Sequence, residues 1–247
     1  RTEQLLHFFQ EEQDAAWNTY VMVTKEPLKD IFSEDLKLPE SLGIYLEDLL
    51  EEWEDVRQGA QVTVGTLMSQ YYSRNETLCV PVLEISDAEE KPQIGGFCVL
   101  FGLQPMGELS LREGEQLMLL QNNLKRYAFT MQDGTRFLLE QVQTEREITA
   151  AVDEAGNQYP VLTVTVRGNS TVSALSWDAD QEDQRQQGKQ ELADRLLTFL
   201  TTQQKEAGMD LANSFLLLAG QERSLWEQYR EEPAQYLSDL KIRLFVE

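Results

Sequence analysis

Residues 94–123 read IGGFCVLFGLQPMGELSLREGEQLMLLQNN and combine the local signals of a strand, a turn and a helix. The apolar run from Phe97 to Leu103 has the length of a strand that is buried on both faces. The Gly95-Gly96 pair is expected to break whatever element precedes it. Residues 104–107, QPMG, predict a turn, because proline presets one dihedral and glycine accepts a positive φ.

The second half of the stretch predicts a capped helix. Ser110 is followed by Glu113 at the spacing of a capping box, in which each residue binds a backbone N–H of the other. Leu117, Leu120 and Leu124 follow at helical spacing. We therefore expect a buried strand, a tight turn and a helix that begins at Ser110.

The chain before this stretch mixes helix and strand patterns. Residues 1–13 have a helical pattern, 16–23 a strand pattern, and Pro27 suits the first turn of a short helix. Ser41 is placed to cap a helix with an apolar stripe, and a further helix is expected at 66–72. Leu78 to Ile85 is apolar but interrupted by Pro81, which indicates an edge strand or the last strand of a domain.

The chain after this stretch predicts two long strands, a long helix, a second helix and a final strand. The two strands cover 135–152 and 158–177, with a turn-rich segment between them and a polar loop at 178–187 after them. The long helix ends at Gly208, and Asp210 is a plausible N-cap for a helix through about Arg230. The strand at 240–247 alternates apolar and basic residues. The fold class is α+β, with mixed or antiparallel sheets flanked by helices in at least two domains.

A domain boundary is predicted at residues 86–92, SDAEEKP, which are polar, charged and end in proline. This segment would link an N-terminal domain at 1–85 to a C-terminal domain at 93–247.

The charge balance excludes two classes of partner. The chain of 247 residues has 43 acidic and 21 basic side chains and a net charge of −22. Binding nucleic acid by neutralising phosphates requires basic surface, and so does binding anionic lipid. No run of 18 apolar residues occurs, so no segment of the sequence has the length to span a bilayer.

The residues that carry common catalytic and metal chemistry are scarce. His7 is the single histidine, and it lies in an apolar context that favours a structural role. The two cysteines, Cys79 and Cys98, lie in strand-like segments and are interpreted as small buried side chains, with a bridge between them as the alternative. Gly102 and Gly107 have Walker-like spacing but lack the following lysine. We expect no catalytic residue, no metal site and no cofactor.

The stretch resembles the C subunit of the Ger-type nutrient germinant receptors of bacterial spores, the Ger(x)C lipoproteins. The resemblance rests on the apolar strand that begins with Phe97, on the Gly107–Ser110 step and on Glu115 at the start of a leucine-rich helix. It continues in the tail, where Asp210 opens a helix that contains Phe215 and Gly220, and Leu225-Trp226 follows. A second tryptophan that is common after this pair in the family is absent.

The resemblance implies a lipoprotein on the outer face of the spore inner membrane that works beside integral membrane subunits. The lipid-bearing cysteine is not in this sequence. Phe97, Glu115, Asp210 and Trp226 are the structural or partner-contact candidates, with Trp226 expected to be a buried anchor or, alternatively, an exposed contact residue. An extracytoplasmic small-ligand-binding module is the alternative function, and a hydrolase that uses two carboxylates is a third possibility.

Overall fold

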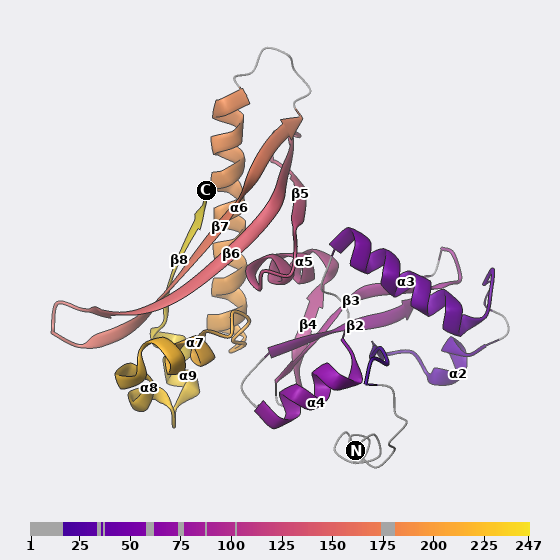
Figure 1. Cartoon of the computed structure of the whole chain (residues 1–247), viewed down its shortest axis with the longest axis horizontal. Helices are drawn as coiled ribbons and strands as arrows, with labels where there is room; N and C mark the ends of the chain where they lie inside the picture. The colour runs from indigo at the N-terminus through magenta and orange to yellow at the C-terminus, as the bar shows by residue number, and fades with distance from the viewer. Residues whose placement is uncertain are drawn as a thin grey trace. The chain divides into compact units, whose positions relative to one another are not determined.

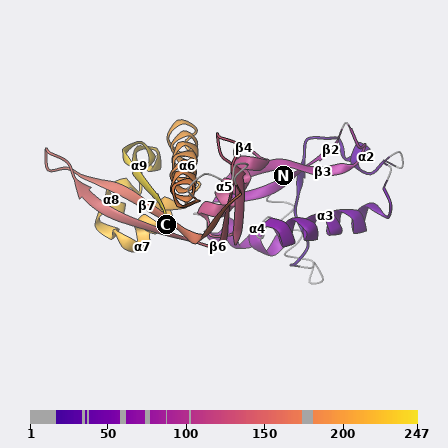
Figure 2. The same ribbon diagram turned by 90° about the horizontal axis from the view of Figure 1, so that it is seen from above.

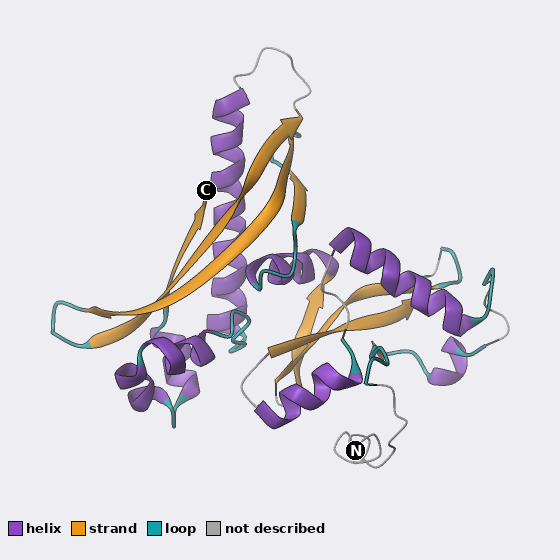
Figure 3. Cartoon of the chain, viewed as in Figure 1, coloured by secondary structure: helices purple, strands orange, loops and turns teal. Residues whose placement is uncertain are grey.

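The structure is a computed structural model, and it describes residues 17–33, 36, 38–57, 62–73, 77–86, 88–101, 103–173 and 181–247. The helix predicted at 1–13 and His7 lie outside these residues. Helices and strands are mixed along the chain (Figure 3), and they form two four-stranded sheets with helices beside each. The chain divides into two compact units, residues 1–114 and 115–247. The α+β prediction is confirmed.

The first unit contains a sheet with the strand order β1-β2-β3-β4. Its strands are β1 (Val23–Thr24), β2 (Thr77–Ile85), β3 (Pro92–Phe101) and β4 (Gln104–Ser110). β1 is parallel to β2, and the other pairs are antiparallel. β2 is therefore an inner strand, and the prediction of an edge strand is wrong. The ladder with the parallel partner β1 includes only Val82 and Leu83, just beyond Pro81, so proline's missing N–H interrupts no ladder on that side.

In the described part of this unit, the helices beside the sheet are α2 (Leu28–Ile31), α3 (Leu42–Arg57) and α4 (Val64–Ser73). All three were predicted. Figures 1 and 2 show α3 and α4 along the same side of the sheet. Leu67 of α4 packs against a buried cluster formed by Val62, Leu78 and Val80. The strand predicted at 16–23 is not continuous, because Tyr20 makes an isolated bridge to Thr63 and β1 begins at Val23.

Ser86 and residues 88–91, predicted as part of a linker, belong to the turn of a hairpin. Ser86 N donates to Lys91 O at 2.8 Å, and Glu90 N donates to Ser86 O at 2.8 Å. β2 and β3 pair on either side of this turn from Ile85↔Pro92 onward. The segment is polar because it is an exposed turn, and the division between compact units falls at 114/115 rather than at 86–92.

Two further predictions from residues 94–107, the break at Gly95-Gly96 and the turn at 104–107, are wrong. Gly95 and Gly96 lie inside β3, where a Cβ on Gly96 would be 2.5 Å from Leu109 O of the neighbouring strand. They permit close approach of the strands and do not end an element. Residues 104–107 belong to β4, and the chain reverses before them, with Leu103 at a φ of 66°.

The predicted capping box is confirmed at the start of α5 (Leu111–Leu120). Ser110 N donates to Glu113 Oε2 at 2.8 Å, and Glu113 N donates back to Ser110 Oγ at 3.4 Å. One residue further on, Gly114 faces the fully buried ring of Phe97, and a Cβ on Gly114 would be 2.1 Å from that ring. This contact fixes the position of the first turn of α5 against β3.

The second unit contains a sheet with the strand order β5-β6-β7-β8. Its strands are β5 (Arg126–Thr130), β6 (Arg136–Val152), β7 (Gln158–Ser173) and β8 (Lys241–Val246). β5, β6 and β7 are antiparallel, whereas β8 is parallel to β7. The two long strands and the final strand were predicted, and β5 was missed.

The helices of this unit are α6 (Gln181–Thr201), α7 (Ser214–Gln221), α8 (Arg223–Tyr229) and α9 (Pro233–Asp239), with a π-helical turn, η1 (Thr202–Glu206), after α6. α6 begins within the segment that was predicted as a loop. Gly208, at a φ of 69°, follows the helical stretch as predicted. The single helix predicted from Asp210 to about Arg230 is interrupted at Glu222, whose φ and ψ of −131° and 66° are not helical.

The core of the second unit repeats the aromatic and glycine contact of the first. Phe137 of β6 is fully buried, and a Cβ on Gly188 of α6 would lie 2.2 Å from its ring. Leu162 and Val164 of β7 and Leu192 and Leu196 of α6 are also fully buried. α6 thus covers the apolar face of the sheet, and Gly188 allows the helix backbone to approach the sheet closely.

The two cysteines lie on neighbouring strands but on opposite faces of the first sheet. Cys98 is paired with Val80, whereas Cys79 is paired with Val99, so the two positions differ by one residue in register. Successive side chains of a strand point to opposite faces. Both thiols are free. Desolvation raises the pKa of Cys79 to about 12, and it also raises the pKa of Cys98.

We expect both thiols to react slowly in the native protein. With a pKa of about 12, roughly one Cys79 in 10⁴ is a thiolate at pH 8, and the thiolate is the nucleophile. A disulfide-exchange reagent should modify Cys98 first and Cys79 only on unfolding in urea. The variants Cys79→Ser and Cys98→Ser identify which thiol gives each kinetic phase of the modification. A native mass lower by two hydrogens would reveal a bridge and contradict this arrangement.

Gly188→Ala should destabilise the second unit by about 1–3 kcal/mol, because the added methyl group overlaps the buried Phe137 ring. Gly220→Ala is the matched control, since Gly220 is also helical and has nothing within 4 Å of its added Cβ. That variant should be neutral or stabilised by up to about 1 kcal/mol. Urea denaturation of both variants measures the difference, and equal midpoints would refute the packing constraint.

Candidate interaction site

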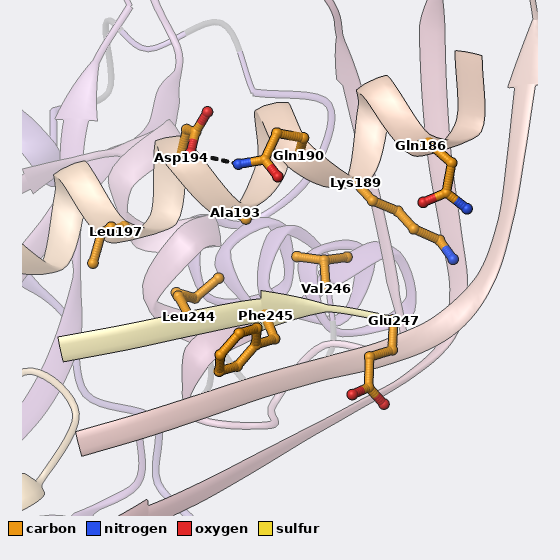
Figure 4. Close-up of a pocket in the computed structure, with 10 residues that line it drawn as sticks. All are labelled: Gln186, Lys189, Gln190, Ala193, Asp194, Leu197, Leu244, Phe245, Val246 and Glu247. Carbon is orange, nitrogen blue, oxygen red and sulfur yellow. Dashed lines mark hydrogen bonds between the residues drawn. The ribbon is translucent and has the colours of Figure 1, made fainter. Parts of the chain in front are cut away.

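A groove of about 430 Å³ lies between α6 and β8 in the second unit (Figure 4). One side consists of the successive turns of α6 that carry Gln186, Lys189, Gln190, Ala193, Asp194 and Leu197. The other side consists of residues 244–247. Figure 4 shows Leu244 and Val246 directed toward α6, and the Phe245 ring directed away from it.

The groove follows the edge of β8 rather than one of its faces. Alternate side chains of a strand point to opposite faces, yet four consecutive residues line the groove. Among the described residues, β8 is the last strand of its sheet and has β7 as its single neighbour. The backbone of β8 is therefore part of the groove wall.

The direction of the backbone groups can be derived from the ladder. Glu247 N donates to Val166 O of β7 at 2.8 Å. Because the direction of N–H and C=O groups alternates along a strand, Phe245 also turns its groups toward β7, and Leu244 and Val246 turn theirs toward the free edge. An edge strand of this kind is a template for pairing with another extended chain.

The charges around the groove are unevenly matched. Arg167 Nε donates to Glu247 Oε2 at 2.7 Å, and Gln190 Nε2 donates to Asp194 Oδ1 at 2.9 Å, so both carboxylates have partners. Lys241 and Arg243 are exposed on β8 and make no ion pair with any residue in the described part of the chain. In an acidic protein, this edge thus carries local positive charge.

A second polar group surrounds Asp210, after η1. Asp210 Oδ1 accepts from Ser214 N at 2.8 Å, and Oδ2 accepts from Phe215 N at 2.8 Å, so its carboxylate caps α7. Gln204 Nε2 also donates to Asp210 Oδ1, at 2.9 Å. The N-cap residue of α7 is Asn213, so the prediction that Asp210 is the N-cap is wrong, although its carboxylate accepts from the first two N–H groups of the helix.

The surroundings of Asp210 are closed. Gln204, Ser214 and Tyr236 are all fully buried, and burial raises the pKa of the Tyr236 phenol. Burial lowers the pKa of Arg146, while the charge of Asp210 acts in the opposite direction. The Phe215 and Tyr236 rings pack with their centroids 5.1 Å apart. We interpret this group as the structural centre of the C-terminal helices rather than as a binding site.

The other candidate residues are dispersed. Phe97 is fully buried in β3 of the first unit, and Glu115 is half-buried in α5. Trp226 is half-buried, so the prediction of a buried anchor is wrong, while Leu225 beside it is fully buried. Leu225 and Tyr229 are four residues apart and lie on the face of α8 that packs against the core. Trp226 is one residue further along the helix than Leu225 and therefore lies at the edge of that face.

The described residues contain no group of three or more His, Cys, Asp or Glu side chains placed to hold a metal ion. Among them, no helix has both the length and the apolar character needed to cross a membrane. The groove between α6 and β8 is the feature that sequence reasoning missed. The alternation of apolar and basic residues at 240–246 was visible, but its partner helix lies about 50 residues away in the chain.

Comparison with known proteins gives two matches. Residues 1–85 match the family described as spore germination protein N-terminal domain. The fold matches the crystal structure of the GerBC protein with a TM-score of 0.74 and 13% sequence identity, over 99% of this chain and 72% of GerBC. No curated protein matches the chain.

Residues 1–85 thus resemble a spore germination protein N-terminal domain, and the α+β fold of the chain is that of GerBC. The resemblance to the Ger(x)C family that the sequence motifs predicted is confirmed by these two matches. The end of the matched N-terminal region at residue 85 coincides with the end of the first predicted domain, whereas the first compact unit extends to residue 114.

Asp210→Asn should destabilise the second unit by about 1–3 kcal/mol, because the amide cannot accept all the hydrogen bonds that the carboxylate accepts from α7 and Gln204. Asp194→Asn, on the exposed side of α6, is the control and should change stability by less than about 0.5 kcal/mol. Chemical denaturation measures both. A variant of Asp210 as stable as the control would show that the cap contributes little.

Proposed function

We propose that this protein is the C subunit of a spore nutrient germinant receptor and acts by contact with integral membrane subunits, without catalysis. The observation that carries the proposal is the spore germination domain at residues 1–85 within a chain that has the GerBC fold throughout. The absence of grouped metal ligands among the described residues agrees with a binding role.

The acidity of the chain bears on how it meets the membrane. With a net charge of −22, the protein is repelled by anionic lipid, so its own surface is not the means of attachment. A lipid on an N-terminal cysteine, on the outer face of the spore inner membrane, would hold it there instead. The anchor would also raise the effective concentration of the membrane subunits, so a weak contact would suffice.

The proposal predicts a specific germination defect. Deletion of the chromosomal copy should abolish germination triggered by the nutrients of the cognate receptor, because the receptor lacks a subunit. Germination by triggers that bypass nutrient receptors should remain normal. Both are measured as the loss of spore refractility with time.

The control is a strain in which the full-length wild-type copy is restored at another locus and nutrient germination returns. Unchanged nutrient germination in a deletion strain with no redundant receptor would overturn the proposal.

A further inference from the structure

We propose that the free edge of β8 binds an extended segment of a partner protein in which apolar residues alternate with carboxylates. This inference rests on the proposed function and locates the contact surface on the groove between α6 and β8. Its basis is the combination of an unpaired strand edge, an adjacent groove and unmatched positive charge.

The dimensions of the groove suit a short strand. The helical stripe from Gln186 to Leu197 covers 11 residue steps, about 16 Å. Four residues of an added strand cover about 13 Å along residues 244–247, and three more would extend it beside Arg243 and Lys241. The unpaired backbone groups of Leu244 and Val246 would bond to such a strand, as in other cases of strand addition.

The two faces of β8 define the chemistry of the incoming segment. On one face, Leu244 and Val246 are half-buried and line the groove beside Ala193 and Leu197, so the segment would place apolar side chains there. On the other face, Lys241 and Arg243 are exposed beside Phe245, which is 49% exposed. Opposite charges across neighbouring strands are favourable, so carboxylates belong on that face.

The same charges disfavour a second copy of this chain as the occupant. If two β8 edges paired about a two-fold axis at Ile242, Lys241 of each copy would lie directly opposite Arg243 of the other. Like charges on facing strands are destabilising. Basic residues on an edge strand thus act against self-association, and they favour an acidic partner.

The test is site-specific crosslinking in spores. Phe245 of the full-length protein is replaced by a photoreactive phenylalanine analogue, and adducts formed on irradiation are mapped by mass spectrometry. We expect an adduct with a membrane subunit of the receptor, within a segment that alternates apolar residues with Asp or Glu. Placing the same analogue at Val152, at the exposed end of β6, is the control for nonspecific capture.

Charge reversal tests the electrostatic part of the inference. The double variant Lys241→Glu with Arg243→Glu should reduce the adduct yield roughly tenfold, because two favourable pairs become repulsive. Lys125→Glu with Arg136→Glu makes the same charge change at exposed positions of the same unit and should leave the yield unchanged. Circular dichroism of the purified variants verifies that both fold.

The outcomes separate the two proposals. The inference would be overturned by the absence of an adduct at Phe245, by an adduct to a second copy, or by a yield that charge reversal does not change. If the deletion strain still has a germination defect, the proposed function would stand. Normal nutrient germination in the deletion strain would overturn the proposed function itself.

Discussion

Each unit of this protein depends on a phenyl ring that occupies the space left open by a helical glycine. Phe97 lies against Gly114 in the first unit, and Phe137 lies against Gly188 in the second, with both rings fully buried on inner strands. A ring in van der Waals contact with the helix backbone permits a close approach of helix and sheet. In the second unit, this approach sets the position of α6, and thereby one wall of the groove beside β8.

The features that depend on neighbours in the chain could be predicted from the sequence. The capping box of Ser110 and Glu113 and the strand alternation at 240–246 are complete within a few residues. The signals at Gly95-Gly96 and at 104–107 were misread because glycine and proline mark both turns and strands under close approach. Only the register with β2 and β4 distinguishes these two meanings.

The candidate site was harder to predict than the fold. A helix of seven residues such as α8 does not define its buried face by periodicity, so the sequence favoured Trp226 as the core residue and did not single out Leu225. The groove requires α6 and β8 to be side by side, which no local pattern encodes. The uncompensated charge of Lys241 and Arg243 is likewise hidden within a chain whose overall charge is strongly negative. The proposed function followed from the family resemblance, and the surface proposed to serve it followed from the structure.

The parallel pairing of β7 with β8 has a consequence for how the protein is made. Val161 and Lys241 are neighbours in the sheet but lie 80 residues apart in the chain, and α6 to α9 are synthesised between them. Until the ribosome has released the last of these residues, the growing polypeptide presents β7 with one side unpaired. Such an exposed side is open to mispairing while a chain is incomplete. The second unit can therefore reach its native state only after translation has delivered β8.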